Sequence, residues 1–148
     1  IRERFLVYKY ESDDFSIFFP QMYEEYLDDA GSFKVTSVEC KRNDDFLLVV
    51  LWNYTEDIFN ASNETETIVK LMIEGVYTRM YPGGKLISNA TTFNGYNGFD
   101  LNYTTENEKV YGKTFYNGNK LYLISFTTQK KEMNLTELNL FYNSFILK

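Results

Sequence analysis

Carboxylates are the side chains of this sequence most often grouped in a way that suggests chemistry. Six lie near the N-terminus: Asp13, Asp14, Glu24, Glu25, Asp28 and Asp29. Calcium prefers such oxygen ligands, but no loop of the D-x-D-x-D-G kind is present. Glycoside hydrolysis needs two carboxylates in a cleft and a raised pKa on one of them, and the sequence indicates neither. We interpret Glu24–Asp29 as a solvated face and predict no metal site.

Histidine is absent and cysteine occurs once, at Cys40. The sequence therefore lacks the commonest general base and the commonest metal ligand, and no intrachain disulfide is possible. Cys40 lies in the alternating segment FKVTSVECK. We interpret it as a small residue of a strand rather than as a reactive thiol. These observations predict a protein that is not an enzyme and that needs no cofactor.

The overall charge excludes two classes of partner. Fifteen basic and 21 acidic residues give a net charge of −6 over 148 residues. Without a basic stripe, neither nucleic acid nor an anionic membrane surface is expected to bind. No run of about 20 apolar residues spans a membrane. The length suits one domain, 1–148, and 44% apolar residues are too many for a disordered chain.

Two short segments are rich in glycine, Tyr81–Gly84 and Gly95–Gly98. Glycine there favours turns with positive φ, and neither segment has a phosphate-binding spacing before a helix. The alternative is that the missing side chains admit a ligand.

Tyrosine is the best functional clue, because its amphipathic ring favours recognition surfaces. Six of the 13 tyrosines lie at predicted helix edges or turns: Tyr23, Tyr26, Tyr54, Tyr77, Tyr81 and Tyr96. Packing at the rim of a sheet competes with a patch that grips a protein or stacks on sugar rings. Five residues are our candidate binding positions: Tyr54, Tyr81, Gly83, Gly84 and Tyr96.

Six Asn-x-Ser/Thr triplets also occur, at Asn53, Asn60, Asn63, Asn89, Asn102 and Asn134. Such triplets accept glycans in secreted eukaryotic chains. Asn53 and Asn102 fall in or near predicted strands, where a glycan is awkward. We interpret the set as a sign of a composition rich in Asn and Thr.

The first half of the chain predicts mainly strands. They are Phe5–Tyr10, Phe15–Phe19, Phe33–Lys41 and Phe46–Tyr54. Pro20 ends the second because it cannot donate to a ladder. The fourth is nearly continuous in apolar residues, which indicates a strand covered on both faces. Gln21–Ala30 is predicted to form one or two helical turns.

The second half predicts two helices and more strands. Thr65 or Thr67 is expected to cap a helix over about 68–80, in which Gly75 weakens the pattern or marks close packing against the sheet. Strands follow at Lys85–Phe93 and Phe99–Thr105, and then a hairpin over Lys109–Ser125. Asn117-Gly118 predicts its type I′ turn. Asn134 or Thr136 caps a last helix through about Ile146, with an apolar stripe of Leu138, Phe141, Tyr142 and Phe145.

These elements make a meander of antiparallel strands with a helix on each face, an α+β fold. Four segments resemble motifs of exported bacterial domains similar to the photosystem II extrinsic protein PsbP. They are FSIFFP from Phe15, GGKLISNATTFNGYNGFDL from Gly83, KTFYNGNKLY from Lys113 and NLFYNSFIL from Asn139. The resemblance covers roughly residues 15–147, although Asn97 and Asp100 fill variable positions and no ligand motif carries over.

The resemblance to PsbP implies an antiparallel sheet sandwiched between helices. It also implies an exported protein of the periplasm, cell envelope or extracellular space, in a family that contains assembly factors and binding modules. The first residue is Ile rather than Met, which fits a removed leader or a trimmed chain. We therefore expect a non-enzymatic binding or assembly domain with a protein partner. A small-ligand or carbohydrate-binding module is the alternative.

Overall fold

The computed structural model describes residues 5–60 and 63–148. Ile1, which was interpreted as a sign of a removed leader or a trimmed chain, lies outside these residues. Seven antiparallel strands form one sheet in the order β3-β4-β5-β9-β8-β7-β6. Their bounds are β3 (Glu24–Asp29), β4 (Phe33–Arg42), β5 (Asp45–Tyr54), β6 (Lys85–Phe93), β7 (Tyr96–Thr104), β8 (Lys109–Asn117) and β9 (Lys120–Thr128).

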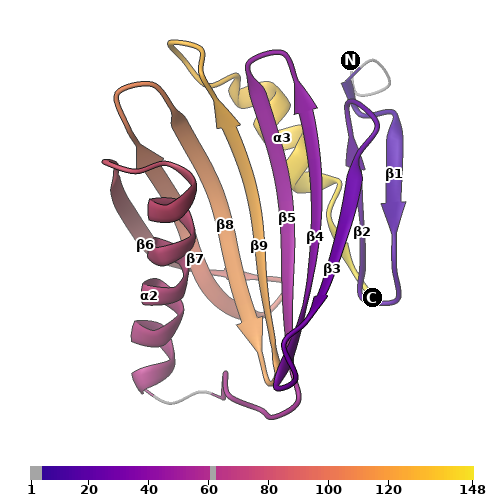
Figure 1. The fold of residues 1–148 in the computed structure, drawn as a ribbon, viewed down its shortest axis with the longest axis vertical. Coiled ribbons are helices and arrows are strands. Elements are labelled where there is room, and N and C mark those ends of the chain that lie inside the picture. Colours follow the sequence, from indigo (N-terminus) through magenta and orange to yellow (C-terminus); the bar gives the residue numbers. More distant parts are fainter. Residues whose placement is uncertain (1–4, 61–62) are drawn as a thin grey trace.

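The sheet is two meanders joined in the middle rather than the single meander that the sequence predicted. Strands β3 to β5 follow one another, and so do β6 to β9, while β5 pairs with β9 from Asp45↔Thr128 to Asn53↔Lys120. Between them, helix α2 (Asn63–Met80) brings the chain from the central strand β5 to the far edge at β6 (Figure 1). The central strands are therefore the ones that carry the longest apolar runs.

A second, smaller sheet has the order β1-β2-β10, with β1 (Tyr8–Glu11), β2 (Phe15–Phe19) and β10 (Ile146–Leu147). The prediction of a last helix through about Ile146 is wrong, because α3 (Leu135–Asn143) ends earlier and the chain then pairs with β2. Ser144 makes this change of direction: its hydroxyl donates to the Phe141 carbonyl and accepts from the Phe18 N–H.

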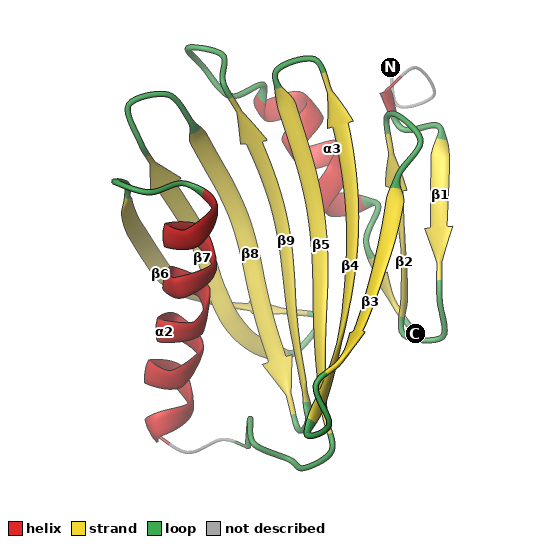
Figure 2. Cartoon of the chain, viewed as in Figure 1, coloured by secondary structure: helices red, strands yellow, loops and turns green. Residues whose placement is uncertain are grey.

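The large sheet separates two cores. Leu47, Val49 and Leu51 face one core and Leu48 and Val50 the other, as the alternation of a strand requires. Helix α2 lies in front of the sheet and α3 behind it (Figure 2). The prediction of an antiparallel α+β fold is thus confirmed. The predicted arrangement of one sheet between helices is incomplete, because the small sheet shares the rear core with α3.

The predicted helical turns over Gln21–Ala30 are wrong. The segment contains strand β3, which pairs with β4 from Glu24↔Glu39 to Asp29↔Lys34 and forms an edge of the sheet. Its six residues are all exposed, so the reading as a solvated face is confirmed. Ladder pairing overrides the helix preference of the glutamates, and charge on an edge strand discourages further pairing.

Two helix starts test the capping predictions. Helix α2 begins at Asn63, so Thr65 and Thr67 lie inside it and do not cap it; Thr65 instead donates to the Asn60 carbonyl. Asn134 does cap α3, because its side-chain oxygen accepts from the Glu137 N–H at 3.1 Å. Of the two candidates that the sequence offered, Asn134 and Thr136, the structure thus selects Asn134.

The hairpin turn of β8 and β9 differs from the prediction by one residue. Asn117 pairs with Lys120, so Gly118 and Asn119 form the loop and only Gly118 has a positive φ, of 59°. This is the pattern of a type II′ turn, with glycine at the first loop position. A turn with positive φ at both loop residues connects β6 and β7 instead, at Asn94 and Gly95.

Gly98 and Gly75 provide opposite tests of what glycine contributes. A Cβ at Gly98 would lie 1.9 Å from the Thr114 carbonyl oxygen, whereas a Cβ at Gly75 would meet only the Arg79 guanidinium at 3.6 Å. Gly98→Ala is expected to lower the free energy of unfolding by about 3 kcal/mol, and Gly75→Ala to raise it by up to about 1 kcal/mol. Urea unfolding followed by Trp52 fluorescence measures both, and equal effects would contradict the packing described.

Buried tyrosines make the fold sensitive to alkali. Burial raises the pKa of both Tyr77 and Tyr142 above the usual value of about 10. The unfolded chain therefore ionises first, so the stability contributed by these neutral phenols is complete below about pH 10 and is lost as the pH rises further. Tyr142→Phe should reduce this decline by about 1.4 kcal/mol per pH unit. Urea unfolding between pH 9 and 11.5 tests it, with the exposed Tyr8→Phe as control.

Candidate functional site

A hollow at one end of the sheet lies where α2 ends beside the β4–β5 turn. It has a volume of about 380 Å³. Its lining comes from four separate parts of the chain, namely Lys41, Asn43, Asp44, Asp45, Phe46, Met80, Tyr81, Glu108, Thr127 and Gln129. We call this hollow the end cavity. Its volume lies within the range of small-molecule sites, which hold a few polar groups on apolar walls.

Tyr81 is fixed at the wall of the end cavity. Its hydroxyl donates to Thr127 Oγ1 at 2.8 Å, and burial raises the pKa of the phenol. The turn that follows α2, at residues 81–84, is held by Tyr103. Its hydroxyl donates to the Tyr81 carbonyl and accepts from the Gly84 N–H. A Cβ on Gly84 would lie 2.4 Å from the Tyr103 ring, so glycine here permits a packing contact inside the protein.

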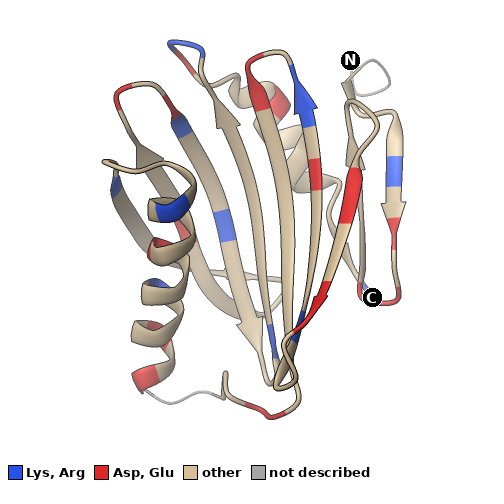
Figure 3. Cartoon of the chain, viewed as in Figure 1, with Lys and Arg blue, Asp and Glu red and all other residues tan. Residues whose placement is uncertain are grey.

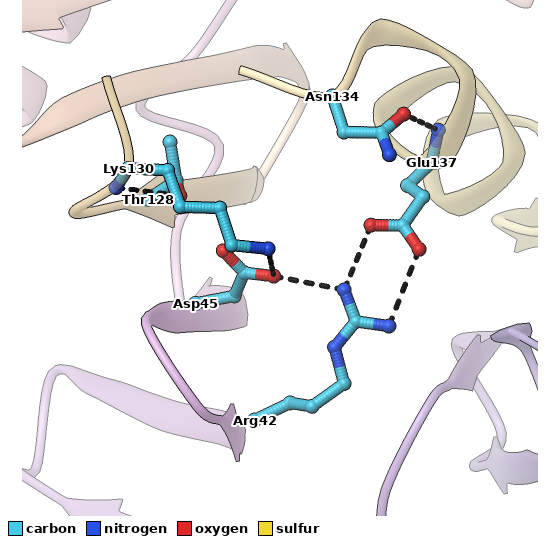
Figure 4. A network of polar contacts seen from close by, with 6 residues as sticks. All are labelled: Arg42, Asp45, Thr128, Lys130, Asn134 and Glu137. Atoms are coloured by element: carbon cyan, nitrogen blue, oxygen red, sulfur yellow. Dashed lines mark hydrogen bonds and ion pairs between the residues drawn. The ribbon is translucent and has the colours of Figure 1, made fainter. Parts of the chain in front are cut away.

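An ion-pair network adjoins the end cavity at Asp45, which belongs to the lining (Figure 4). The Arg42 guanidinium donates to Glu137 of α3 at 2.7 and 3.3 Å and to Asp45 at 2.8 Å. Lys130 Nζ lies 3.9 Å from Asp45, whose side chain is only 3% exposed. Arg42 also stacks on the Phe5 ring, 4.6 Å from its centre. The network thereby links the β4–β5 turn to the start of α3.

The end cavity combines charged groups with apolar surface. Lys41, Asp44 and Glu108 offer charges at its rim, and Phe46 and Met80 offer apolar surface. Residues 5–60 and 63–148 contain no group of three His, Cys, Asp or Glu side chains placed to hold a metal ion. Cys40 is buried in β4, where burial raises the pKa of its thiol, in agreement with its reading as a strand residue.

Three apolar side chains on the front of the sheet are only half-buried. They are Val35 of β4 and Phe46 and Trp52 of β5. We call these three side chains the open face. Leu48 and Val50, which lie between Phe46 and Trp52 on the same side, are buried in the core that α2 covers. Residues 47–51 are all buried, so the prediction that Phe46–Tyr54 is covered on both faces is confirmed for the middle of the strand, while Phe46 and residues 52–54 are half-buried.

The far border of the open face is acidic. Glu39 and Val35 are four residues apart in β4 and therefore point to the same side. Glu24 of β3 pairs with Glu39 and Asp28 pairs with Val35, so both carboxylates share that side. Tyr26, 50% exposed, stands between the two β3 carboxylates. Lys41 is the basic residue beside them. Figure 3 shows acidic segments along β3.

The five predicted binding residues do not form one surface. Tyr81, Gly83 and Gly84 lie at the end of the sheet that carries the end cavity. Tyr54 lies at the opposite end of the open face and packs on Phe33 and Phe59.

Tyr96 belongs to the rear core, against Phe115, and borders a separate hollow of about 320 Å³ with Asn117 and Gly118. Strands of nine residues put roughly 25–30 Å between the two ends.

Other tyrosines of the predicted set serve the fold. Tyr77 is fully buried and donates to Ser125 Oγ at 3.0 Å, and Tyr23 packs on Tyr10 and Phe19. The residues that sequence reasoning missed are Val35, Phe46 and Trp52. Their signal was present as alternate apolar positions in two strands, but only the tertiary structure shows that these three side chains stay half-buried.

A solved structure has the same architecture. The solution structure of cyanobacterial PsbP (CyanoP) from Synechocystis sp. PCC 6803 matches with a TM-score of 0.63 and 14% sequence identity, covering 95% of this chain and 91% of that chain. The protein therefore has a PsbP-like fold, which confirms the resemblance seen in the sequence. No family model and no curated protein matches the chain. Within the described residues, no helix is long and apolar enough to cross a bilayer.

The Arg42 network yields a stability prediction. Arg42→Ala leaves Asp45 buried with only the more distant Lys130, so the free energy of unfolding should fall by about 3 kcal/mol. Lys9→Ala removes an exposed partner of Glu11, at 3.7 Å, and should cost less than about 1 kcal/mol. Urea unfolding at pH 7 compares the two variants, and similar losses would show that the network is no stronger than a surface pair.

Proposed function

We propose that this protein is a non-enzymatic binding or assembly domain of an exported bacterial protein and that it contacts a protein partner. The observation that carries the proposal is the open face, where Phe46 and Trp52 are only half-buried, together with the exposed apolar side chains of Ile68 and Leu71 on α2. Contiguous exposed apolar surface with a polar border is typical of protein interaction sites. Tryptophan and tyrosine are also the residues that most often dominate binding energy at such sites.

Export and the bacterial origin rest on the resemblance to PsbP-like domains. Because function resides in sites rather than in folds, the fold likeness alone supports no partner. What favours a protein partner over a substrate is the character of the open face: it is extended, apolar and bordered by charge, and its residues come from regular elements.

The proposal is tested by affinity capture from a native bacterial envelope extract, with the whole chain as bait and mass spectrometry as the readout. We expect one partner at near-stoichiometric amounts. Trp52→Ala should reduce its recovery at least tenfold without changing circular dichroism. Ile87→Ala, an exposed apolar change at the far edge strand β6, is the matched control and should leave recovery unchanged. No enrichment over an unrelated bait would refute the proposal.

A second candidate function is a small-ligand or carbohydrate-binding module, and the end cavity favours it. Tyr81, the predicted binding residue that borders this cavity, stands across from Phe46. A ligand that binds only the native state raises the melting temperature. A thermal-shift screen with glycans and lipids tests this function. A hit should disappear in Tyr81→Ala and persist in Tyr96→Ala, because Tyr96 lies in the other hollow.

A further inference from the structure

The two edges of the seven-stranded sheet are protected to very different degrees. Edge strand β3 has the sequence EEYLDD, and such a density of carboxylates discourages pairing with a further strand. Edge strand β6, with the sequence KLISNATTF, is charged at Lys85 alone and contains neither proline nor glycine (Figure 1). It pairs with β7 without a bulge, from Lys85↔Thr104 to Phe93↔Tyr96. A long, regular edge of this kind is a template for another strand.

The turn at Asn94 and Gly95 fixes which backbone groups of β6 point to the free edge. In a hairpin with a two-residue loop, the flanking residues exchange both of their hydrogen bonds, and here these residues are Phe93 and Tyr96. Because bonding alternates along the strand, the odd-numbered residues of β6 bond to β7. The N–H and C=O groups of the even-numbered residues point away from β7, and these residues are Leu86, Ser88, Ala90 and Thr92. Within residues 5–60 and 63–148, no strand other than β7 pairs with β6.

The side chains of β6 leave this edge accessible. Leu86 packs against the front core, and Phe93 stacks on Phe115 at the rear, with ring centres 4.5 Å apart. Between them, the side chains of Asn89 and Ala90 are exposed. The middle of the strand therefore carries no bulky or charged group that would obstruct an approaching backbone.

The sequence of β6 complements itself about a two-fold axis at Asn89. Antiparallel pairing with a second copy of β6 places Leu86 opposite Thr92 and Ser88 opposite Ala90. Every N–H and C=O group that points to the free edge then meets its counterpart in the other copy. Such a symmetric pair closes about eight backbone hydrogen bonds.

The side chains on the rear complement one another in the same register. Asn89 lies opposite its own copy, and an amide is both a donor and an acceptor, so the two side chains match. Lys85 lies opposite the ring of Phe93, and an ammonium group is attracted to an aromatic face. A pair of β3 edges would instead bring carboxylates opposite carboxylates, which is destabilising. Charge therefore favours pairing at β6 and opposes it at β3.

We propose that two copies of this chain pair along β6, antiparallel and with two-fold symmetry, so that their sheets become continuous. The acidic β3 edge then ends the joined sheet on both sides, and the assembly stops at two copies. The proposal goes beyond the proposed function. Strands β9, β8 and β7 separate β6 from the strands that carry the open face, which stays accessible in the dimer.

The size of the contact predicts a weak dimer. Strand β6 contributes 9 residues from each copy, fewer than the 20–30 residues a side of a standard interface. We expect half-dissociation on the order of 10–100 µM, which sedimentation equilibrium of the whole chain between about 1 µM and 1 mM measures. Trp52→Ala, on the open face, should leave this equilibrium unchanged. A monomer throughout the range would overturn the proposal.

An engineered disulfide tests the register. In the proposed pair, the Cα atoms of the two residues 89 are about 4.5 Å apart, which suits a disulfide. Asn89→Cys should therefore form a covalent dimer under molecular oxygen, seen in non-reducing electrophoresis. Ile87→Cys, on the same side of the strand, lies about 13 Å from its copy and should stay monomeric. Cys40 is buried and takes no part. Equal linking of both variants, or of neither, would overturn the proposal.

Charges on the axis give a second test that needs no oxidation. Asn89→Lys and Asn89→Glu each place like charges opposite one another, whereas a mixture of the two variants pairs lysine with glutamate. At low salt, the mixture should dimerise about tenfold more tightly than either variant alone. Circular dichroism of each variant checks that it folds. Equal affinities would contradict an axis at Asn89.

Other occupants of the edge give different outcomes. Dimers in sedimentation without the Asn89→Cys disulfide would assign self-association to another surface and refute pairing along β6. A photo-reactive residue replacing Asn89 that crosslinks to a captured protein, rather than to a second copy, would assign the edge to a strand of that protein. Either outcome refutes the second copy at β6 and leaves the capture test of the open face unaffected, because that test depends on Trp52.

Discussion

The pairing of β5 with β9 is the contact on which the rest of the structure depends. It joins two meanders that are separate in the chain, and its register of Asp45↔Thr128 to Asn53↔Lys120 puts the most apolar strands at the centre of the sheet. A slip of one residue would turn Leu47 and Val49 to the front and Leu48 and Val50 to the rear. Both cores therefore require this one register, and α2 must be long enough to return the chain along the sheet before β6 begins.

A seven-stranded sheet has more surface than two helices can cover. At the rear, α3 is helped by the small sheet β1-β2-β10, and their aromatic side chains fill the core around Phe115 and Phe145. At the front, α2 covers the core, and Val35, Phe46 and Trp52 stay half-buried at its border. The open face is the result of this unequal coverage.

The residues that resemble PsbP-like motifs hold the frame rather than a ligand. Gly98 allows β7 to approach β8, Gly84 allows the Tyr103 ring to approach the break after α2, and Ser144 ties the end of α3 to β2. These contacts explain why the resemblance identified the fold and why it carried no site. The open face is instead built from Val35, Phe46 and Trp52, which lie outside the quoted motifs.

Local patterns in the sequence determined most of the elements. Period-two alternation located the strands from β4 onward, Asn134 marked the start of α3, and the stripe of Leu138, Phe141 and Tyr142 identified its buried side, because these signals arise within a few residues. Glu24–Asp29 misled the prediction because its pairing with β4 is a tertiary contact that overrides local propensity. Only the tertiary structure decided that Tyr81 and Tyr96 lie on different surfaces. It also decided that Phe46 and Trp52 stay half-buried while Leu48 and Val50 between them are buried, since coverage depends on where a helix distant in sequence comes to rest.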